Sequence, residues 1–285
     1  MTLFPKNIEK IIVPPIKCQG IKTKLVHFIA NNINWNGEGK WVEPFLGSGV
    51  VVYNLNPDRA LLADTNKHII DFYKSIQSQK ITKENLKDRL VEMGKNLSKY
   101  GEEYYYEIRD RFNKYGDVFD FIFLNRSCFN GLMRFNSKGK FNVPFGHKRN
   151  RFSQSYITKI TNQVDKISKI LINKNWDFIT SDWRDTLKKV NKEDFVYLDP
   201  PYIGRHTDYF NSWTAVDAIE LSHIASNLNC KYALSMWLEN RYRKNDHINI
   251  HWKNTEIKTF SHFYHVGSTE SLRNQMTEAL ITNIQ

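Results

Sequence analysis

A strand-like run that ends in a carboxylate and two prolines carries the clearest chemistry in this chain. Residues 196–202 read Val-Tyr-Leu-Asp-Pro-Pro-Tyr, which predicts a buried strand that stops at Asp199. Pro200 and Pro201 have no N–H, so the carbonyls of Asp199 and Pro200 are left without local partners. A carboxylate and a carbonyl can together grip one –NH₂ group, and Tyr202 adds a flat ring. The pattern favours an aromatic amine such as adenine N6; a strand followed by a plain Pro-Pro turn is the alternative.

A second group of residues with ligand-binding character lies nearer the amino terminus. Residues 42–49 read Val-Glu-Pro-Phe-Leu-Gly-Ser-Gly, a strand running into a turn whose glycines allow close approach of a ligand. The turn is neither a P-loop nor a complete GxGxxG motif. The next predicted strand ends at Asp64, where a carboxylate can hold a ribose diol. Together with Asp199, this pattern predicts an adenosine-bearing cofactor beside an adenine-like target; a structural turn is the alternative.

Composition and charge narrow the class of protein. The 285 residues carry 41 Lys and Arg against 30 Asp and Glu, a net charge of +11, which is typical of nucleic-acid-binding proteins. Mean hydropathy is −0.55, and no apolar run approaches the roughly 20 residues that span a bilayer. The three cysteines lack CxxC spacing, and the histidines, including His206 near Asp208, show no ligand pattern. We therefore expect a cytoplasmic protein with no membrane partner and no metal.

The positive charge is concentrated in one block. No acidic residue occurs from Phe121 to Val164, and basic residues alternate there with phenylalanines. Such a block predicts a surface that follows nucleic-acid phosphates; a merely solvated face would carry both signs. The basic residues are Arg126, Arg134, Lys138, Lys140, Lys148, Arg149, Arg151 and Lys159, and the phenylalanines are Phe129, Phe135, Phe141, Phe145 and Phe152.

Strand-like and helix-like segments alternate in the first 79 residues and again after residue 165. This alternation predicts an α/β fold with a mostly parallel sheet covered by helices. Residues 80–165 differ, because they contain polar helices and a Gly/Asn/Lys-rich segment near 130–151 that is typical of a β-hairpin. We predict a catalytic domain of residues 1–79 and 166–285, with an inserted, mostly helical target-recognition subdomain at 80–165.

At this point the sequence resembles a known family, the Dam-type DNA adenine-N6 methyltransferases of the α group. The resemblance covers nearly the whole chain, and its most specific part is the Asn-Gly-Leu, Arg-Phe-Asn and Phe-Asn-Val-Pro-Phe-Gly combination within residues 130–146. It implies a Rossmann-like, S-adenosylmethionine-dependent fold that methylates adenine N6 in double-stranded DNA. Since N6 lies within the base stack, the adenine must be flipped out, with Tyr202 as its stacking platform. Further matches lie at 17–22, 42–49, 62–66, 124–126, 129–136, 139–146 and 199–202.

The resemblance assigns catalytic and cofactor residues by position. The catalytic motif falls on Asp199, Pro200, Pro201 and Tyr202. Cys18 replaces the family's usual tryptophan, and Asp185 competes with Asp182 for the adenine amine of the cofactor. The expected cofactor residues are Cys18, Lys22, Glu43, Phe45, Gly47, Gly49, Asp64, Asp182, Trp183 and Asp199.

The resemblance also implies a DNA-reading surface. Dam-type enzymes read GATC, or a site containing GAT, with an N-terminal lysine and the recognition hairpin. The matching positions are Lys17, Phe129, Asn130, Leu132, Arg134 and Pro144, while Arg126, Lys138, Lys140, Lys148, Arg149 and Arg151 complete the expected DNA-binding set, the last five at phosphates. We expect a restriction–modification system whose endonuclease acts on the same site without forming a stable complex.

Two other classes of protein compete with this interpretation. A methyltransferase acting on RNA adenine or another planar amine would keep the motif at 199–202 but lack the DNA-reading hairpin. A non-catalytic DNA-binding relative would keep the basic block but lose the cofactor residues. Both groups of residues are present in this chain, so the sequence favours an enzyme acting on duplex DNA.

Overall fold

A single seven-stranded sheet organises the part of the chain that the computed structural model describes, residues 4–202, 213–241, 244–253, 255–263 and 275–283. The strand order is β3-β2-β1-β4-β5-β7-β6. Strands β3 to β5 are all parallel, and β7 runs antiparallel to both of its neighbours. The strands are β1 (Trp41–Glu43), β2 (Arg59–Asp64), β3 (Asn175–Thr180), β4 (Phe195–Leu198), β5 (Lys231–Asn240), β6 (Thr255–Phe263) and β7 (Gln275–Asn283).

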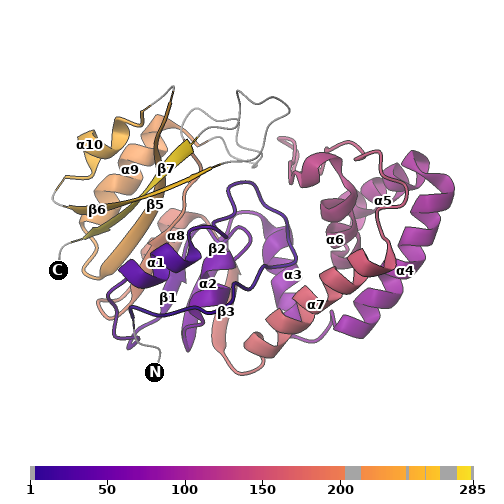
Figure 1. The fold of residues 1–285 in the computed structure, drawn as a ribbon, viewed down its shortest axis with the longest axis horizontal. Coiled ribbons are helices and arrows are strands. Elements are labelled where there is room, and N and C mark those ends of the chain that lie inside the picture. Colours follow the sequence, from indigo (N-terminus) through magenta and orange to yellow (C-terminus); the bar gives the residue numbers. More distant parts are fainter. Residues whose placement is uncertain (1–3, 203–212, 242–243, 254, 264–274, 284–285) are drawn as a thin grey trace.

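Helices cover both faces of this sheet, and a further group lies beside it (Figure 1). Helices α1 to α3 pack on one face, and α8 to α10 pack on the other. Helices α4 to α7 form the group at the side. The helices are α1 (Val26–Asn32), α2 (Val50–Leu55), α3 (Lys67–Gln77), α4 (Lys83–Tyr100), α5 (Glu102–Tyr115), α6 (Val118–Ser127), the 3₁₀ turn η1 (Phe129–Gly131), α7 (Gln154–Leu171), α8 (Trp183–Leu187), α9 (Ala215–Ser226) and α10 (His247–His251).

The central strands are apolar on both sides because both sides are covered. Successive side chains of a strand point to opposite faces, so Trp41 and Phe195 reach the core under α1 and α2, whereas Val42 and Val196 reach the core under α8 and α9. The rings of Trp41 and Phe195 stack with centroids 5.1 Å apart. This packing fixes β1 against β4 at the centre of the molecule.

The chain reverses its direction across the sheet between β1 and β4. It leaves β1 for β2 and β3 on one side and returns to β4 on the other. Ligand crevices form outside the carboxyl ends of strands at such a switch point. Strand β1 ends at Glu43, and β4 ends one residue before Asp199. The predicted α/β sheet is confirmed, and it brings the two motifs together at one edge.

Residues 80–165 are mostly helical, as predicted, but they are not separated from the rest by a clean boundary. Helix α7 runs unbroken through residue 165 and packs against both α4 and α3. One apolar core continues from the sheet face into these helices. Capping by Thr82, Asp117 and Ser153 explains where α4, α6 and α7 begin.

The predicted hairpin near 130–151 has the path of a hairpin without a regular ladder. Two isolated antiparallel bridges join Cys128 to Phe145 and Phe135 to Phe141, around a turn in which the Gly139 N–H donates to the Asn136 carbonyl at 2.9 Å. The pattern of alternating phenylalanines was misleading as a surface signal. Phe135, Phe141, Phe145 and Phe152 are buried in the core, and of this set Phe129 alone is exposed.

Candidate active site

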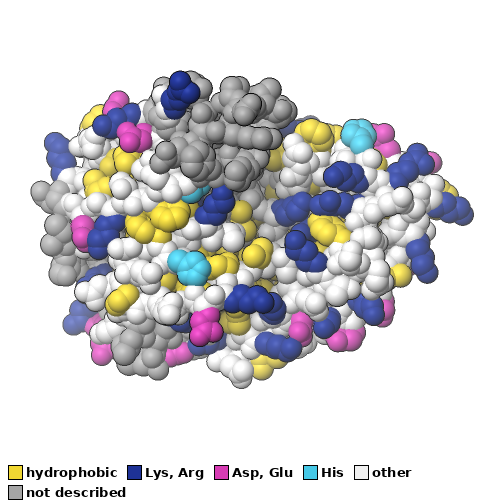
Figure 2. Space-filling view, viewed as in Figure 1, with side chains coloured by type: hydrophobic (Ala, Val, Ile, Leu, Met, Phe, Trp, Pro, Cys, Tyr) yellow, Lys and Arg dark blue, Asp and Glu magenta, His cyan; other side chains and the backbone are white. Residues whose placement is uncertain are grey.

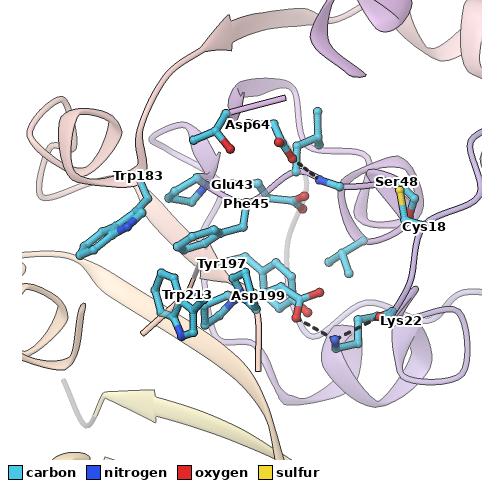
Figure 3. A pocket seen from close by; sticks show the side chains of 18 of the residues that line it. Cys18, Lys22, Glu43, Phe45, Ser48, Asp64, Trp183, Tyr197, Asp199 and Trp213 are labelled. Atoms are coloured by element: carbon cyan, nitrogen blue, oxygen red, sulfur yellow. Dashed lines mark hydrogen bonds and ion pairs between the residues drawn. The ribbon is translucent and has the colours of Figure 1, made fainter. Parts of the chain in front are cut away.

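One cavity of about 340 Å³ opens at the carboxyl edge of the sheet and collects most of the predicted site (Figure 3). Its walls come from the segment before α1, the turn after β1, the end of β2, the start of α8 and the residues after β4. The predicted residues that line it are Cys18, Lys22, Glu43, Phe45, Gly47, Asp64, Asp182, Trp183, Asp199, Pro200, Pro201 and Tyr202. Burial raises the pKa of the Cys18 thiol, so Cys18 contributes a neutral wall.

An ion pair between Lys22 and Asp199 forms one side of the cavity. The Lys22 Nζ lies 2.7 Å from Asp199 Oδ1, and Lys22 is almost fully buried. The Ser235 hydroxyl, from β5, donates to the same carboxylate oxygen at 3.2 Å. Burial raises the pKa of Asp199, and Lys22 opposes that rise. The ion pair and the hydrogen bond fix the direction of the carboxylate.

The ring of Tyr202 is held from two sides. Its hydroxyl donates to the Glu278 carboxylate, with O–O distances of 2.9 and 3.1 Å. The Lys22 ammonium lies 5.1 Å from the ring centroid, a favourable cation–π distance. Glu278 lies on β7 and is itself buried. A buried carboxylate needs polar partners, and the Tyr202 hydroxyl is one of them. Strand β7 therefore contributes to the orientation of Tyr202.

The turn after β1 presents its backbone to the cavity, next to a carboxylate from the end of β2. Asp64, at the end of β2, accepts from the N–H of Gly47 at 2.9 Å and of Asn66 at 2.8 Å. Burial raises the pKa of Asp64 to about 6, although these two bonds oppose it. Gly49 does not line the cavity. Its φ of +69° and the Tyr53 ring, 2.7 Å from where a Cβ would lie, require glycine for the turn itself.

Glu43 is a second buried carboxyl in the same wall. Burial raises its pKa to about 8, a bond from the Trp41 indole N–H at 2.8 Å opposes this rise, and Asp199 adds to it. A cationic group bound beside Glu43 would favour its ionised form.

Three aromatic rings form the opposite wall, where Figure 3 shows Phe45, Trp183 and Trp213 grouped away from Lys22. The centroid of Phe45 lies 6.2 Å from Trp183 and 5.6 Å from Trp213. Such a group offers flat apolar surface to a purine ring. Trp213 was not predicted, because it follows residues 203–212 with no local pattern that ties it to the site.

The structure distinguishes the two acids that competed for a place at the cofactor. Asp182 lines the cavity and caps α8 by accepting from the Arg184 N–H at 2.9 Å. Asp185 is turned to solvent and pairs with Lys188 at 2.8 Å. Arg184 covers the Trp183 ring and binds Asp217 and Glu220 of α9. Helix α9 thus fixes the position of this aromatic wall.

Apart from Lys17, which precedes α1, the expected DNA-binding residues lie on the group of side helices and its loop. Figure 2 shows Lys and Arg side chains gathered on this face of the molecule. Arg134 is exposed, and its Nε donates to Asn142 Oδ1 at 3.0 Å. Phe129, Asn130, Lys138, Lys140, Pro144, Lys148 and Arg149 are also exposed, and Lys17, Leu132 and Arg151 are half-buried.

Arg126 is the exception, because the structure buries it between α6 and α7. Its guanidinium donates to Gln163 at 2.7 Å and to the Tyr156 hydroxyl at 3.4 Å. Arg151 stacks on the same Tyr156 ring. Burial raises the pKa of Tyr156, but Arg126, Lys17 and Arg151 outweigh it and lower the pKa. Arg126 therefore supports the basic surface from within and does not reach the surface itself.

Metal ions and membranes have no visible site in the described residues. Within them, no group of three His, Cys, Asp or Glu side chains could hold a metal ion; His206 and Asp208 lie outside these residues. No helix of the described part is long and apolar enough to cross a bilayer.

Comparison with known proteins decides which reaction this geometry serves. Residues 19–266 match the family described as D12 class N6 adenine-specific DNA methyltransferases. The chain belongs to this family. It is 33% identical to the type II methyltransferase M.MjaIII of Methanocaldococcus jannaschii over 72% of this chain and 75% of that protein. It is also 30% identical to a DNA adenine methylase of Serratia marcescens, over 70% and 73%, and 29% identical to the type II methyltransferase M1.LlaDCHI of Lactococcus lactis, over 85% of each.

Membership of the D12 class confirms the enzyme class inferred from residues 199–202 and the recognition segment. The protein is an adenine-specific DNA methyltransferase, and DNA is its substrate. DNA methyltransferases in general take the methyl group from S-adenosylmethionine. The cavity suits such a donor, because it combines carboxyl groups for a cation and hydroxyls with an aromatic wall for a purine.

Proposed function

We propose that this D12-class enzyme methylates adenine within GATC, or within a longer or asymmetric site that contains GAT. The observation that supports this proposal is the contact between the two segments that match DNA-reading positions. The Lys17 side chain lies against Gly131, where a Cβ would stand 2.5 Å from the Lys17 Cδ. The N-terminal lysine and the loop that carries Asn130 and Arg134 therefore form one continuous surface.

S-adenosylmethionine is the methyl donor of the proposed reaction and supplies the transferable methyl group. Asp182 and Trp183 would hold its adenine, Asp64 its ribose, and Glu43, Phe45, Gly47 and Lys22 the rest. Cys18 borders the same space without an aromatic ring. Gly49 contributes through the shape of the turn.

The residues after β4 act on the target base. The Asp199 carboxylate and the Pro200 carbonyl accept the two N6 hydrogen bonds, which favours a pyramidal nitrogen whose lone pair is available. Preorganised acceptors of this kind stabilise the charge that develops at the nitrogen. Pro201 fixes the backbone, and Tyr202, held by Glu278, stacks on the flipped adenine.

Mapping methylated adenines on a plasmid tests the proposed site. We expect modification of the adenine in GATC, with GAT-containing sites as the alternative outcome. Modification spread over sites without GAT would contradict the proposal. We also propose that the enzyme belongs to a restriction–modification system, because two of its relatives are named type II methyltransferases. An endonuclease whose cleavage is blocked by methylation at the mapped site would establish this membership.

Replacing Arg134 with Ala should relax this specificity at one base pair. Arg134 is exposed and oriented by Asn142, and a bidentate arginine–guanine contact contributes about 1–3 kcal/mol of discrimination. The measurement is the ratio of kcat/KM on duplexes that differ at single positions. Lys138→Ala is the control, because loss of a phosphate contact weakens all sequences alike. Equal behaviour of the two variants would remove the base-reading role from Arg134.

Binding of S-adenosylmethionine is expected to release protons from the protein. Burial raises the pKa of Glu43 to about 8 and that of Asp64 to about 6, so Glu43 is mostly protonated at pH 7 before binding. A cationic ligand favours the ionised forms, so affinity should rise with pH between 6 and 8, by up to about tenfold per pH unit for one proton. Isothermal titration calorimetry at pH 7 in buffers of different ionisation enthalpy measures the release.

The matched variants are Glu43→Gln, which should abolish most of the release at pH 7, and Glu38→Gln, which should retain it. Glu38 is exposed and lies outside the cavity. Identical binding enthalpies of the wild type in all buffers would show that neither carboxyl changes its protonation on binding.

A further inference from the structure

The amide of Asn125 forms an unusual pair of hydrogen bonds. Its Oδ1 accepts from the N–H of Lys17, and its Nδ2 donates to the carbonyl of Lys17, both at 2.9 Å. Asn125 lies on α6 and is fully buried. The Asn125 side chain thus bonds both the N–H and the C=O of Lys17, as the main chain of a neighbouring β-strand would. The position of Lys17 is fixed relative to α6.

Helix α6 carries the loop that Lys17 adjoins. The helix ends at Ser127, two residues before the turn η1 (Phe129–Gly131). The Lys17 side chain then lies against Gly131. The main chain of Lys17 is therefore held by α6 and its side chain by η1, the next element along the chain, so its ammonium has a defined place beside the loop.

The other end of the same short segment reaches the catalytic carboxylate. Residues 18–22 line the cavity, and the Lys22 ammonium lies 2.7 Å from Asp199. Lys22, which pairs with Asp199, follows Lys17, which Asn125 binds, by only five positions. We therefore expect a displacement of Lys17 to reach the cavity along this short stretch of main chain.

We propose that Asn125 is a positioning residue: it fixes the N-terminal segment relative to α6, and so determines site specificity in the methyl-transfer step. This inference rests on the proposed roles of Lys17 and Asp199. With the two hydrogen bonds intact, Lys17 can meet its base only in the position in which Lys22 supports Asp199. Without them, the two lysines settle independently, and duplexes with a wrong base are methylated at rates closer to that of the correct site.

The chain offers a matched control for this proposal. Asn54, on α2, makes the same two bonds to the main chain of Ile12, both at 2.8 Å. It grips the same N-terminal segment five residues upstream of Lys17. Asn54→Ala therefore removes an equivalent pair of bonds, together with one to the Val50 carbonyl within α2 at 2.7 Å, without loosening the contact with α6.

The test compares Asn125→Ala and Asn54→Ala on the site that mapping identifies for the wild type. Single-turnover rates are measured on that duplex and on duplexes with one base pair replaced, together with thermal unfolding and S-adenosylmethionine binding. For Asn125→Ala we expect the ratio of correct to incorrect rates to fall roughly tenfold to a hundredfold, the scale of an ångström-sized misplacement. Asn54→Ala should keep the ratio even where its unfolding temperature falls.

Two outcomes would overturn the proposal: an unchanged ratio in Asn125→Ala, or equal losses of the ratio in both variants. Should Asn125→Ala not fold, Asn125→Asp keeps the shape and the acceptor while removing the donor to the Lys17 carbonyl, and the same ratio decides. Wild-type methylation away from GATC would contradict the proposed site but leaves this comparison valid, because the test uses the mapped site.

Discussion

Replacing Asp199 with Asn should reduce methyl transfer by at least about a hundredfold to a thousandfold, the usual loss when one preorganised polar group is removed from an active site. The amide keeps the size of the side chain but loses the negative charge and replaces one acceptor oxygen with an NH₂ donor. Asn is preferable to Ala, because Ala would leave the buried ammonium of Lys22 facing an empty space. Single-turnover incorporation of labelled methyl groups into duplex DNA measures the effect, with binding of DNA and S-adenosylmethionine retained.

The opposite end of the same strand provides the control. Asp194 is also buried and accepts from the backbone N–H groups of Lys40 and Asn191 at 2.7 and 2.8 Å. Asp194→Asn should therefore lower stability but leave the rate of transfer largely intact. An Asp199→Asn enzyme that retains a tenth or more of the wild-type rate would exclude the proposed role of this carboxylate.

The sequence predicted the cavity well because its walls lie at strand ends that carry strong local signals. A proline directly after the strand marks the stops at Glu43 and Asp199, and at Asp64 an apolar run ends in the acid itself. Parallel strands bring such ends to one edge. Local sequence could not predict which of Asp182 and Asp185 lines the cavity. That depends on the orientation of α8, which the contacts of Arg184 with α9 determine.

Residues that act from other strands escaped prediction for a different reason. Ser235 and Glu278 reach the site only through the pairing of β5 with β4 and β7. Glu278 did carry a usable signal, a lone carboxylate in the predicted strand 277–282, since buried charges are costly without partners. Arg126 shows the converse. Its charge predicted a surface position, but the mostly apolar segment 118–124, which contains one acid (Asp120), places it in a helix whose residues are all buried except Phe119.

The second large effect is expected from Lys22→Met, and it should appear in the pH dependence of the rate. In the proposed reaction, the ionised carboxylate of Asp199 accepts the N6 hydrogen bond and stabilises the charge that develops at the nitrogen. Burial raises its pKa, and Lys22 is the group that opposes this rise most strongly. Without the ammonium, the pKa of Asp199 rises further, because a close opposite charge is lost. The acid limb of the profile of rate against pH should therefore move to higher pH, and the rate should recover in more alkaline buffer.

Two controls separate the charge of Lys22 from its other contacts. Lys174→Met removes a mostly buried lysine that pairs with Asp58 at 2.8 Å far from the cavity, and it should leave the profile in place. Lys22→Arg keeps a positive charge beside Asp199 and should restore the acid limb toward its original pH even where the maximal rate stays low. A uniform loss of rate at every pH in Lys22→Met would mean that Lys22 acts through contacts alone, because only a change in the ionisation of Asp199 moves the limb.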